Sequence, residues 1–255
     1  MMEQTNILKR DTVLELKNLH KSFGNNHVLN GFNMKLYQGE NLVIMGKSGS
    51  GKSVMIKCLV GLMEADKGSI SVMHNDITKL DQAALDILRA DIGFLFQGSA
   101  LYDSMTVREN LEFPLRRHTK KFGENIDTEK LIIEALENVG LVSAIDLMPS
   151  ELSGGMKRRV ALARTLILQP KIILYDEPTS GLDPITAKEI IMLMQDIQKK
   201  YDTSALIITH DVDCARVISD RMILLIEGTD YAVGTFKELS NSNDPNIKAF
   251  FKQEL

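Results

Sequence analysis

Hydrophobic and polar residues alternate in two segments near the amino terminus. Residues 13–17 and 32–36 place apolar side chains at every second position, with polar residues between them. This period of two is typical of half-buried strands in an antiparallel sheet. Residues 70–72 continue the pattern, and Asn75 with Asp76 is expected to form a turn. We therefore predict an antiparallel β-layer in the first part of the chain.

Runs of consecutive apolar residues predict a second group of strands, buried on both faces. They cover residues 42–45, 92–96, 172–175 and 205–208. Between the last two runs, Pro184 begins a helical pattern with one apolar face. The order strand, helix, strand is typical of a parallel sheet, so we predict an α/β fold. Residues 222–226 and 231–233 flank a Glu-Gly turn and predict a closing hairpin.

Helical patterns dominate the segment from about residue 98 to 169. Thr106 and Glu109 have the spacing of a capping box, in which each side chain bonds the backbone N–H of the other residue. Asp127 is expected to cap a second helix, which has an apolar stripe and ends at Gly140. We interpret this segment as a helical insertion in the α/β domain.

Composition narrows the class of protein. The 255 residues are 44% hydrophobic and 25% charged, which suits one large globular domain. A net charge of −4, the lack of tryptophan and 5% aromatic residues provide neither a basic field nor a stacking surface, so we expect no nucleic-acid partner. Cys58 and Cys214 lie in separate helical patterns and are expected to be buried free thiols. Residues 1–10 contain no apolar leader segment, and no stretch reaches the length of a membrane span.

A glycine-rich loop with the pattern G-x-x-x-x-G-K-S follows the first apolar run. Its glycines permit backbone conformations in which successive N–H groups converge on phosphate oxygens at the positive end of the next helix. Lys52 is expected to reach the β- and γ-phosphates, and the Ser53 hydroxyl to coordinate Mg²⁺. A flexible linker is the alternative, but the flanking strand and helix are the context that a phosphate loop requires. The candidate phosphate-binding residues are Gly46, Lys47, Ser48, Gly49, Ser50, Gly51, Lys52 and Ser53.

Polar residues stand at the carboxyl ends of the predicted parallel strands, where open α/β sheets bind their ligands. Asp176 follows four apolar residues and has the position of a Mg²⁺ ligand. Glu177, one residue further, is the candidate general base for an attacking water. Gln97 could orient that water or contact Mg²⁺, and His210 could hydrogen-bond the γ-phosphate. For each of them, the alternative is an ordinary polar residue at a strand end.

A second pair of glycines opens a basic helix. Residues 152–156 read Leu-Ser-Gly-Gly-Met and precede a segment rich in Lys and Arg. Two glycines at a helix start can form another phosphate cradle. For the basic run itself, residues 157–164, we expect a solvated helix face.

With these motifs in order along its whole length, the chain resembles the nucleotide-binding subunit of an ABC transporter. The resemblance assigns a Q-loop at Gln97, a signature at Leu152-Ser153-Gly154-Gly155, a Walker B motif with Glu177, a D-loop at Ser180-Gly181-Leu182-Asp183 and a switch histidine at His210. Phe23 matches the A-loop aromatic residue that stacks on adenine, although Tyr is more common there. Met156 stands where the signature usually ends in Gln.

The resemblance also implies the fold and the assembly. It implies one nucleotide-binding domain over 1–255, with a β-layer and a P-loop NTPase (RecA-like) core at about 12–97 and 170–235, a helical signature subdomain at about 98–169 and a helical tail at 236–255. In ABC ATPases the signature of one chain closes over ATP held by another, so one set of motifs implies a two-fold homodimer that binds ATP and Mg²⁺. Each site would combine Lys52, Ser53, Gln97, Asp176, Glu177 and His210 of one protomer with Ser153, Gly154, Gly155 and Asp183 of its partner.

Four shorter stretches narrow the resemblance to the ATPase of Mla-type transporters, which move phospholipids with an integral permease and an MCE-domain protein. They are residues 96–107, 113–116, 148–156 and 183–186, although Gly98-Ser99-Ala100 departs from the Ser-Gly-Ala order of that group. This resemblance implies a peripheral location at the cytoplasmic face of the inner membrane. Lipoprotein release, small-solute transport, a soluble ABC ATPase and a binding module without turnover are the alternatives.

The same resemblance suggests where the permease docks. In ABC transporters the region after the Q-loop receives a helix of the permease, and here that region contains Leu101, Tyr102 and Met105. Exposed apolar side chains at these positions would form a docking groove. The alternative is that all three fill the core of the helical insertion.

Overall fold

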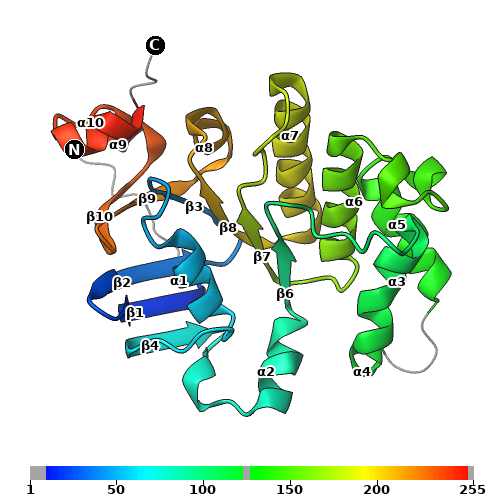
Figure 1. The fold of residues 1–255 in the computed structure, drawn as a ribbon, viewed down its shortest axis with the longest axis horizontal. Coiled ribbons are helices and arrows are strands. Elements are labelled where there is room, and N and C mark those ends of the chain that lie inside the picture. The colour runs from blue at the N-terminus through cyan, green and yellow to red at the C-terminus, as the bar shows by residue number, and fades with distance from the viewer. Residues whose placement is uncertain (1–9, 123–126, 252–255) are drawn as a thin grey trace.

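The computed structural model describes residues 10–122 and 127–251, which form two sheets flanked by helices (Figure 1). The expectation for residues 1–10 therefore falls almost wholly outside the described residues, as do the last four residues of the predicted tail. The first sheet is antiparallel and has the strand order β2-β1-β4-β5. Its strands are β1 (Thr12–Phe23), β2 (Asn26–Tyr37), β4 (Lys67–Val72) and β5 (Asn75–Asp76). This confirms the antiparallel β-layer.

One local prediction in this layer is wrong. Asn75 and Asp76 do not form the turn but pair with Val72 and Ser71 as the short strand β5. The turn lies at Met73 and His74, which have positive φ angles of 45° and 65°. A positive φ is most common at glycine and asparagine. Met73 and His74 are therefore not residues from which a turn would be predicted locally.

The second sheet has the strand order β10-β9-β3-β8-β7-β6. Strands β9, β3, β8, β7 and β6 run parallel, and β10 pairs antiparallel with β9 as the predicted hairpin. Their bounds are β3 (Asn41–Met45), β6 (Ile92–Leu95), β7 (Ile172–Asp176), β8 (Ser204–Thr209), β9 (Arg221–Ile226) and β10 (Thr229–Gly234). Every residue of β3 and β8 is buried, as the continuous apolar runs predict.

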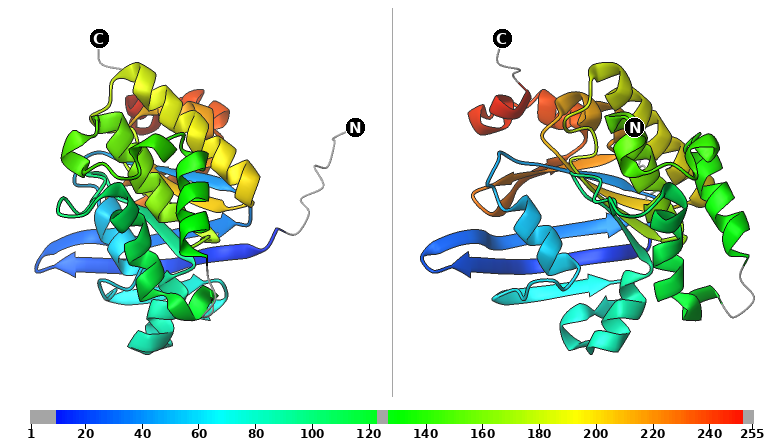
Figure 2. Two further views of the ribbon diagram at one scale, coloured as in Figure 1. Left: turned by 90° about the vertical axis from the view of Figure 1, so that its right-hand side faces the viewer. Right: turned by 45° about the vertical axis from the view of Figure 1, so that its right-hand side comes forward.

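Most helices pack on this parallel sheet or extend from it. In the right-hand view of Figure 2, the helices of the segment 98–169 gather at the end of the molecule away from β10. The α-helices are α1 (Lys52–Leu59), α2 (Gln82–Arg89), α3 (Val107–Arg117), α4 (Thr119–Phe122), α5 (Thr128–Asn138), α6 (Gly154–Leu166), α7 (Pro184–Tyr201), α8 (Val212–Ile218), α9 (Phe236–Ser240) and α10 (Pro245–Phe251). Short 3₁₀ turns cover Ile77–Lys79, Val142–Ala144 and Pro149–Glu151.

Local capping explains where the helices of this segment begin. At the start of α3, the Glu109 N–H donates to Thr106 Oγ1 over 3.2 Å, and the Thr106 N–H donates to Glu109 Oε2 over 2.8 Å. This is the predicted capping box. Asp127 caps α5 by accepting from the Lys130 N–H over 3.0 Å, and Gly140 follows the helix with a φ of 68°.

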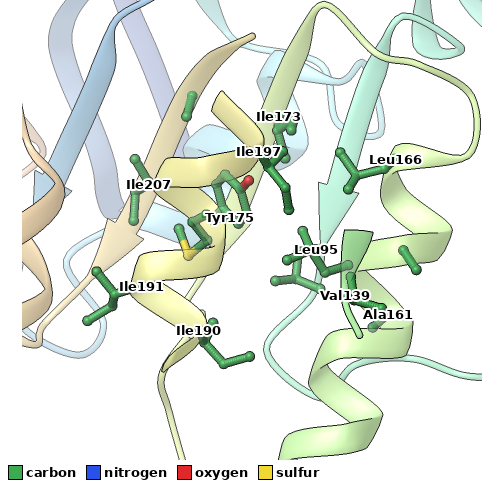
Figure 3. Packing of buried hydrophobic residues seen from close by; sticks show 14 of the residues in the cluster. Leu95, Val139, Ala161, Leu166, Ile173, Tyr175, Ile190, Ile191, Ile197 and Ile207 are labelled. Carbon is green, nitrogen blue, oxygen red and sulfur yellow. The ribbon is translucent and has the colours of Figure 1, made fainter. Parts of the chain in front are cut away.

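The parallel sheet separates two buried apolar clusters. Successive residues of a strand point to opposite faces, so Tyr175 and Ile207 belong to the cluster under α6 and α7, while Leu174 and Leu206 face the antiparallel layer. Figure 3 shows Tyr175 among the side chains of the first cluster. Helices and the antiparallel layer cover the two faces of this sheet. A ligand can therefore bind at the ends of its strands.

Both cysteines are buried and unpaired, as predicted. Cys58 lies in α1 and Cys214 in α8, each at most 1% exposed. Burial raises the pKa of the Cys58 thiol, and it raises the pKa of Cys214 to about 12. Within residues 10–122 and 127–251, no helix has the length and hydrophobicity needed to cross a membrane.

Candidate nucleotide-binding site

The glycine-rich loop connects β3, which ends at Met45, to α1, which begins at Lys52. Gly51 is the N-cap of α1 and has a left-handed φ of 105°. A Cβ atom on this residue would lie 2.8 Å from the backbone oxygen of Val28, so both its conformation and its surroundings require glycine. The loop therefore brings backbone N–H groups close together at the start of a helix, where the helix dipole favours an anion.

Lys52 and Ser50 provide polar groups for such an anion. The Lys52 ammonium donates to the backbone oxygens of Gly46 and Lys47 over 2.6 and 3.0 Å. Burial lowers the pKa of Lys52, although the nearby Asp176 and Glu177 carboxylates oppose the shift. The Ser50 hydroxyl is buried and has no hydrogen-bond partner among the described residues. A buried polar atom without a partner is costly, and a phosphate oxygen would satisfy it.

Two acidic residues end β7 beside this loop. Burial and the neighbouring Glu177 charge raise the pKa of Asp176. Glu177 itself is only 8% exposed and has a left-handed φ of 50°, which is unusual for a glutamate. Its N–H donates to the Ile208 oxygen of the adjacent strand over 2.8 Å. The backbone therefore turns sharply at Glu177 and remains fixed to β8.

His210 lies against Glu177. The distance between His210 Nδ1 and Glu177 Oε1 is 2.9 Å. The Thr209 hydroxyl and the His210 N–H donate to the other carboxylate oxygen, Oε2, over 3.3 and 3.4 Å. Most of the His210 side chain is exposed, whereas the Glu177 carboxylate is largely covered. This pair thus presents an imidazole to solvent and a carboxylate whose orientation is restricted.

These residues surround one pocket of about 490 Å³. Its walls combine the phosphate loop with the strand-end residues, and Val28 of β2 closes one side. The complete lining is Val28, Ser48, Gly49, Ser50, Gly51, Lys52, Ser53, Val54, Gln97, Asp176, Glu177 and His210. Gln97 also donates from Nε2 to the Ser180 hydroxyl over 3.3 Å, which ties the Q-loop to the segment after β7. Phe23 lies at the end of β1, half exposed and outside this lining.

The donor set suits Mg²⁺ bound together with a phosphate. No group of three or more His, Cys, Asp or Glu side chains forms a metal cage in the part of the chain that the structure describes. Mg²⁺ commonly takes one or two protein oxygens and completes its shell with substrate phosphates and water. Ser53, Asp176 and Gln97 line the pocket beside the phosphate loop and are the candidate oxygen ligands.

The residues expected to act across a dimer interface lie outside this pocket in their own chain. Ser153 is the N-cap of α6, where its hydroxyl accepts from the Met156 N–H over 3.2 Å, and Gly154 and Gly155 form the first turn. Asp183 caps α7 by accepting from the backbone N–H groups of Ile185 and Thr186, each over 3.1 Å. Hydrogen bonds from Thr186 lower the pKa of Asp183, which keeps its carboxylate ionised.

The expectation of a solvated basic face on α6 is wrong at Arg158. This side chain is 3% exposed, and its guanidinium donates to backbone oxygens near Gln97. Burial lowers its pKa. A sequence signal for this burial exists, because Arg158 has the helical spacing of Ala161, Leu162 and Thr165, which are all buried. The position of this arginine in an apolar stripe therefore indicates a buried contact, although the Lys and Arg content of the run favours a solvated face.

The chain is similar to several known proteins. A family model described as "ABC transporter" matches residues 29–180. The chain is 39% identical over 237 residues to the probable ribonucleotide transport ATP-binding protein mkl of Mycobacterium leprae, an alignment that covers 93% of this chain and 68% of that protein. It is also 39% identical over 234 residues to the methionine import ATP-binding protein MetN of Brucella abortus, covering 91% and 63%. The chain thus spans about two thirds of the length of these relatives.

Two solved structures resemble the fold over most of their length. The dimeric ATP-binding cassette MJ0796, bound to ADP and Pi in a post-hydrolysis state, is 32% identical with a TM-score of 0.78, and the match covers 88% of this chain and 98% of that one. CbiO1 of Clostridium perfringens, part of the ABC transporter complex cbiONQ, is 28% identical with a TM-score of 0.82, covering 94% and 99%. The chain therefore belongs to the ABC transporter family, as an ATP-binding subunit.

Proposed function

We propose that this chain hydrolyses ATP as a two-fold homodimer. The observation that carries the proposal is the pocket in which the phosphate loop faces the His210–Glu177 pair. Ser153 and Asp183 lie outside this pocket, and a second protomer related by a two-fold axis could supply them to it. The dimeric cassette MJ0796, bound to ADP and Pi, supports the same arrangement by similarity.

Each pocket residue has a definite task on this proposal. The loop N–H groups and Lys52 bind the phosphates, and Ser53, Gln97 and Asp176 hold Mg²⁺, which neutralises phosphate charge. Glu177 accepts a proton from the water that attacks the γ-phosphate. The contact of His210 Nδ1 orients the Glu177 carboxylate, and the exposed part of the imidazole borders the pocket in which the γ-phosphate would lie. Phe23 stacks on the adenine.

Complementation between two inactive variants tests the shared site. Lys52→Ala removes the cation of the phosphate loop, whereas Ser153→Arg blocks the contact with the ATP of the other protomer. Each variant alone should release almost no phosphate. A 1:1 mixture should recover up to about a quarter of the wild-type rate, because random pairing makes half of the dimers mixed and each mixed dimer has one complete site. A mixture that stays as inactive as its components would contradict a site built from two chains.

We further propose that ATP hydrolysis drives phospholipid movement by a separate membrane permease with an MCE-domain protein. The support is the Mla-type sequence of residues 96–107 and of the three shorter stretches. On this proposal the chain works as a peripheral subunit at the cytoplasmic face of the inner membrane. Ribonucleotide transport or methionine import is the second candidate, because the two curated relatives are named for these activities.

The docking surface is smaller than the sequence suggested. Leu101 is partly buried and packs against the larger apolar cluster, so it belongs to the core of the helical segment. Tyr102 is 43% exposed, and its ring lies 4.9 Å from the Phe113 ring and 5.7 Å from the Arg164 guanidinium. We therefore assign the permease contact to Tyr102.

Reconstitution with a candidate permease distinguishes the candidate substrates. Vesicles containing the complex should transfer a fluorescent phospholipid when ATP is supplied, and they should not accumulate labelled methionine or ribonucleotide. ATP-dependent uptake of either solute, without lipid transfer, would replace the phospholipid proposal. Tyr102→Ser should weaken binding to the permease, whereas Tyr231→Ser, a matched change at a tyrosine 42% exposed on β10, should leave it intact.

A further inference from the structure

Arg158 is a buried cation that contacts two distant segments of the chain. It belongs to α6, which begins at the signature. Its Nη1 donates to the Phe96 oxygen over 2.8 Å, and its Nη2 donates to the Gln97 oxygen over 2.5 Å and to the Ser180 oxygen over 3.3 Å. One guanidinium thus joins the signature helix to the Q-loop and to the segment that leads into α7.

The charge of Arg158 is balanced only by these carbonyl groups. Among the described residues no carboxylate forms an ion pair with it, and its buried Nε has no hydrogen-bond partner. Burying a guanidinium without a carboxylate is costly unless its hydrogen bonds are well formed. The position of α6 at Arg158 is therefore sensitive to any shift of the Phe96, Gln97 or Ser180 backbone.

The contacted segments serve different ATP molecules in the proposed dimer. Gln97 lines the pocket of its own chain. The signature at Ser153 and the D-loop from Ser180 to Asp183 face the ATP of the partner. A second link runs beside the first, because the Gln97 side chain donates to the Ser180 hydroxyl. Arg158 thus lies between two functional regions. The Q-loop would contact the nucleotide bound by its own chain, and the signature and the D-loop would contact the nucleotide bound by the partner.

We propose that Arg158 is a positioning residue that couples the two ATP sites. When ATP fixes the Q-loop, the Phe96 and Gln97 carbonyls hold the guanidinium, which in turn orients α6 and the Ser180 segment for the partner. A planar guanidinium suits this task because its N–H groups point in fixed directions, whereas a lysine ammonium can reach fewer of the carbonyls. The inference rests on the proposed homodimer and goes beyond it, since Arg158 lies outside the pocket lining and is only 3% exposed, so it would act through the segments that it contacts.

The test separates nucleotide binding from dimer formation. Glu177→Gln serves as the parent, because slow hydrolysis preserves the ATP that bridges the protomers. Arg158→Met removes every donor but keeps an unbranched stem, and Arg158→Lys keeps the charge. Arg159→Met is the matched control, since Arg159 lies one position along α6 and contacts Val139 and Glu189 instead. Binding of a fluorescent ATP analogue is measured on dilute protein, and dimer formation is followed by light scattering as ATP is added.

Arg158→Met should bind the analogue like the parent but need at least about fivefold more ATP to dimerise, which is the low end of typical coupling between sites. The ATP concentration that dimerises Arg158→Lys should lie between the values for the parent and for Arg158→Met. The Arg159→Met control should match the parent. Equal dimerisation midpoints for the parent and both Arg158 variants would overturn the inference. Equal losses of nucleotide affinity and dimerisation would also overturn it, since a merely structural role predicts them.

Two further results remain interpretable. If Arg158→Met unfolds, Arg158→Lys decides alone, because it retains the charge and at least one hydrogen bond. If the Glu177→Gln parent itself stays monomeric at saturating ATP, the proposed homodimer fails, and the inference fails with it. If the parent dimerises normally and the Arg158 variants dimerise like the parent, only the proposed role of Arg158 is contradicted.

Discussion

The imidazole of His210 lies on the carboxylate of Glu177, with 2.9 Å between Nδ1 and Oε1. The two residues follow neighbouring parallel strands, and Asp176 pairs with Ile208 in the register of β7 and β8. The Glu177 N–H donates to the Ile208 oxygen, which continues the pairing by one residue and directs the glutamate side chain toward His210. Sheet register therefore sets the geometry of this pair.

Glu177→Gln should slow ATP hydrolysis by about 10²- to 10⁴-fold, the usual contribution of a general base. The amide has nearly the same shape but cannot accept the proton, so nucleotide affinity should stay the same. Phosphate release and binding of a fluorescent ATP analogue measure the two quantities. Near-normal turnover would remove Glu177 from the base role. His210→Ala should also lower the turnover rate, because it frees Oε1 from the contact that orients it.

Lys52→Ala should weaken ATP binding by about 10- to 100-fold, since a hydrogen bond to a charged group contributes about 1.5–3 kcal/mol. The lysine ammonium lies within the loop and is available to the phosphates. Lys57→Ala is the control, because Lys57 is exposed in the last turn of the same helix. Isothermal titration with ATP checks both variants, and equal affinities would contradict the phosphate-loop assignment.

Asp176→Asn should stabilise the nucleotide-free protein while abolishing Mg²⁺-dependent hydrolysis. Burial and Glu177 raise the pKa of Asp176, so its ionised form costs folding free energy at neutral pH. The melting temperature of the nucleotide-free protein should therefore rise. The gain should shrink as the pH falls through the raised pKa, because wild-type Asp176 then becomes neutral.

Thermal melts in EDTA from about pH 3 to 8 check this dependence, because this range begins below the ordinary Asp pKa of about 3.9 and extends above the raised one. Asp103→Asn, at an exposed position after the Q-loop, is the control and should not change the melting temperature at any of these pH values. If Asp176→Asn instead destabilises the protein at neutral pH, the ionised carboxylate makes a favourable contact that exceeds the free-energy cost of its burial.

Neither cysteine should react with iodoacetamide in the native protein. Cys58 and Cys214 are at most 1% exposed, and burial raises the pKa of both thiols, that of Cys214 to about 12. The reactive thiolate is therefore scarce and inaccessible at neutral pH. Mass spectrometry should detect alkylation only after denaturant is added. Rapid labelling without denaturant would indicate local opening of α1 or α8.

The sequence by itself determined the features that depend on near neighbours. The phosphate loop is recognisable because glycines must occupy the left-handed φ at Gly51, and a lysine must follow at the helix start. The capping residues Thr106 and Asp127 are recognisable because each bonds a backbone group only three residues away. Burial on both faces made the parallel strands continuous apolar runs, so their existence was also predictable.

Only the tertiary structure decided which distant residues meet. Gln97 and Ser180 are 83 positions apart, and their contact depends on how β6 lies beside β7. Arg158 was misread because a run of charged residues is usually solvated, whereas this helix turns the arginine toward the Q-loop carbonyls. For Leu101 the sequence left a docking groove and the core of the helical insertion as alternatives, and the structure packs its partly buried side chain against the larger apolar cluster. Short-range patterns set the elements of this protein, but the packing of α6 on the parallel sheet determines which of their faces are buried. The helical spacing of Arg158 with Ala161 and Leu162 indicates a buried stripe, but it does not tell which distant segment covers that stripe.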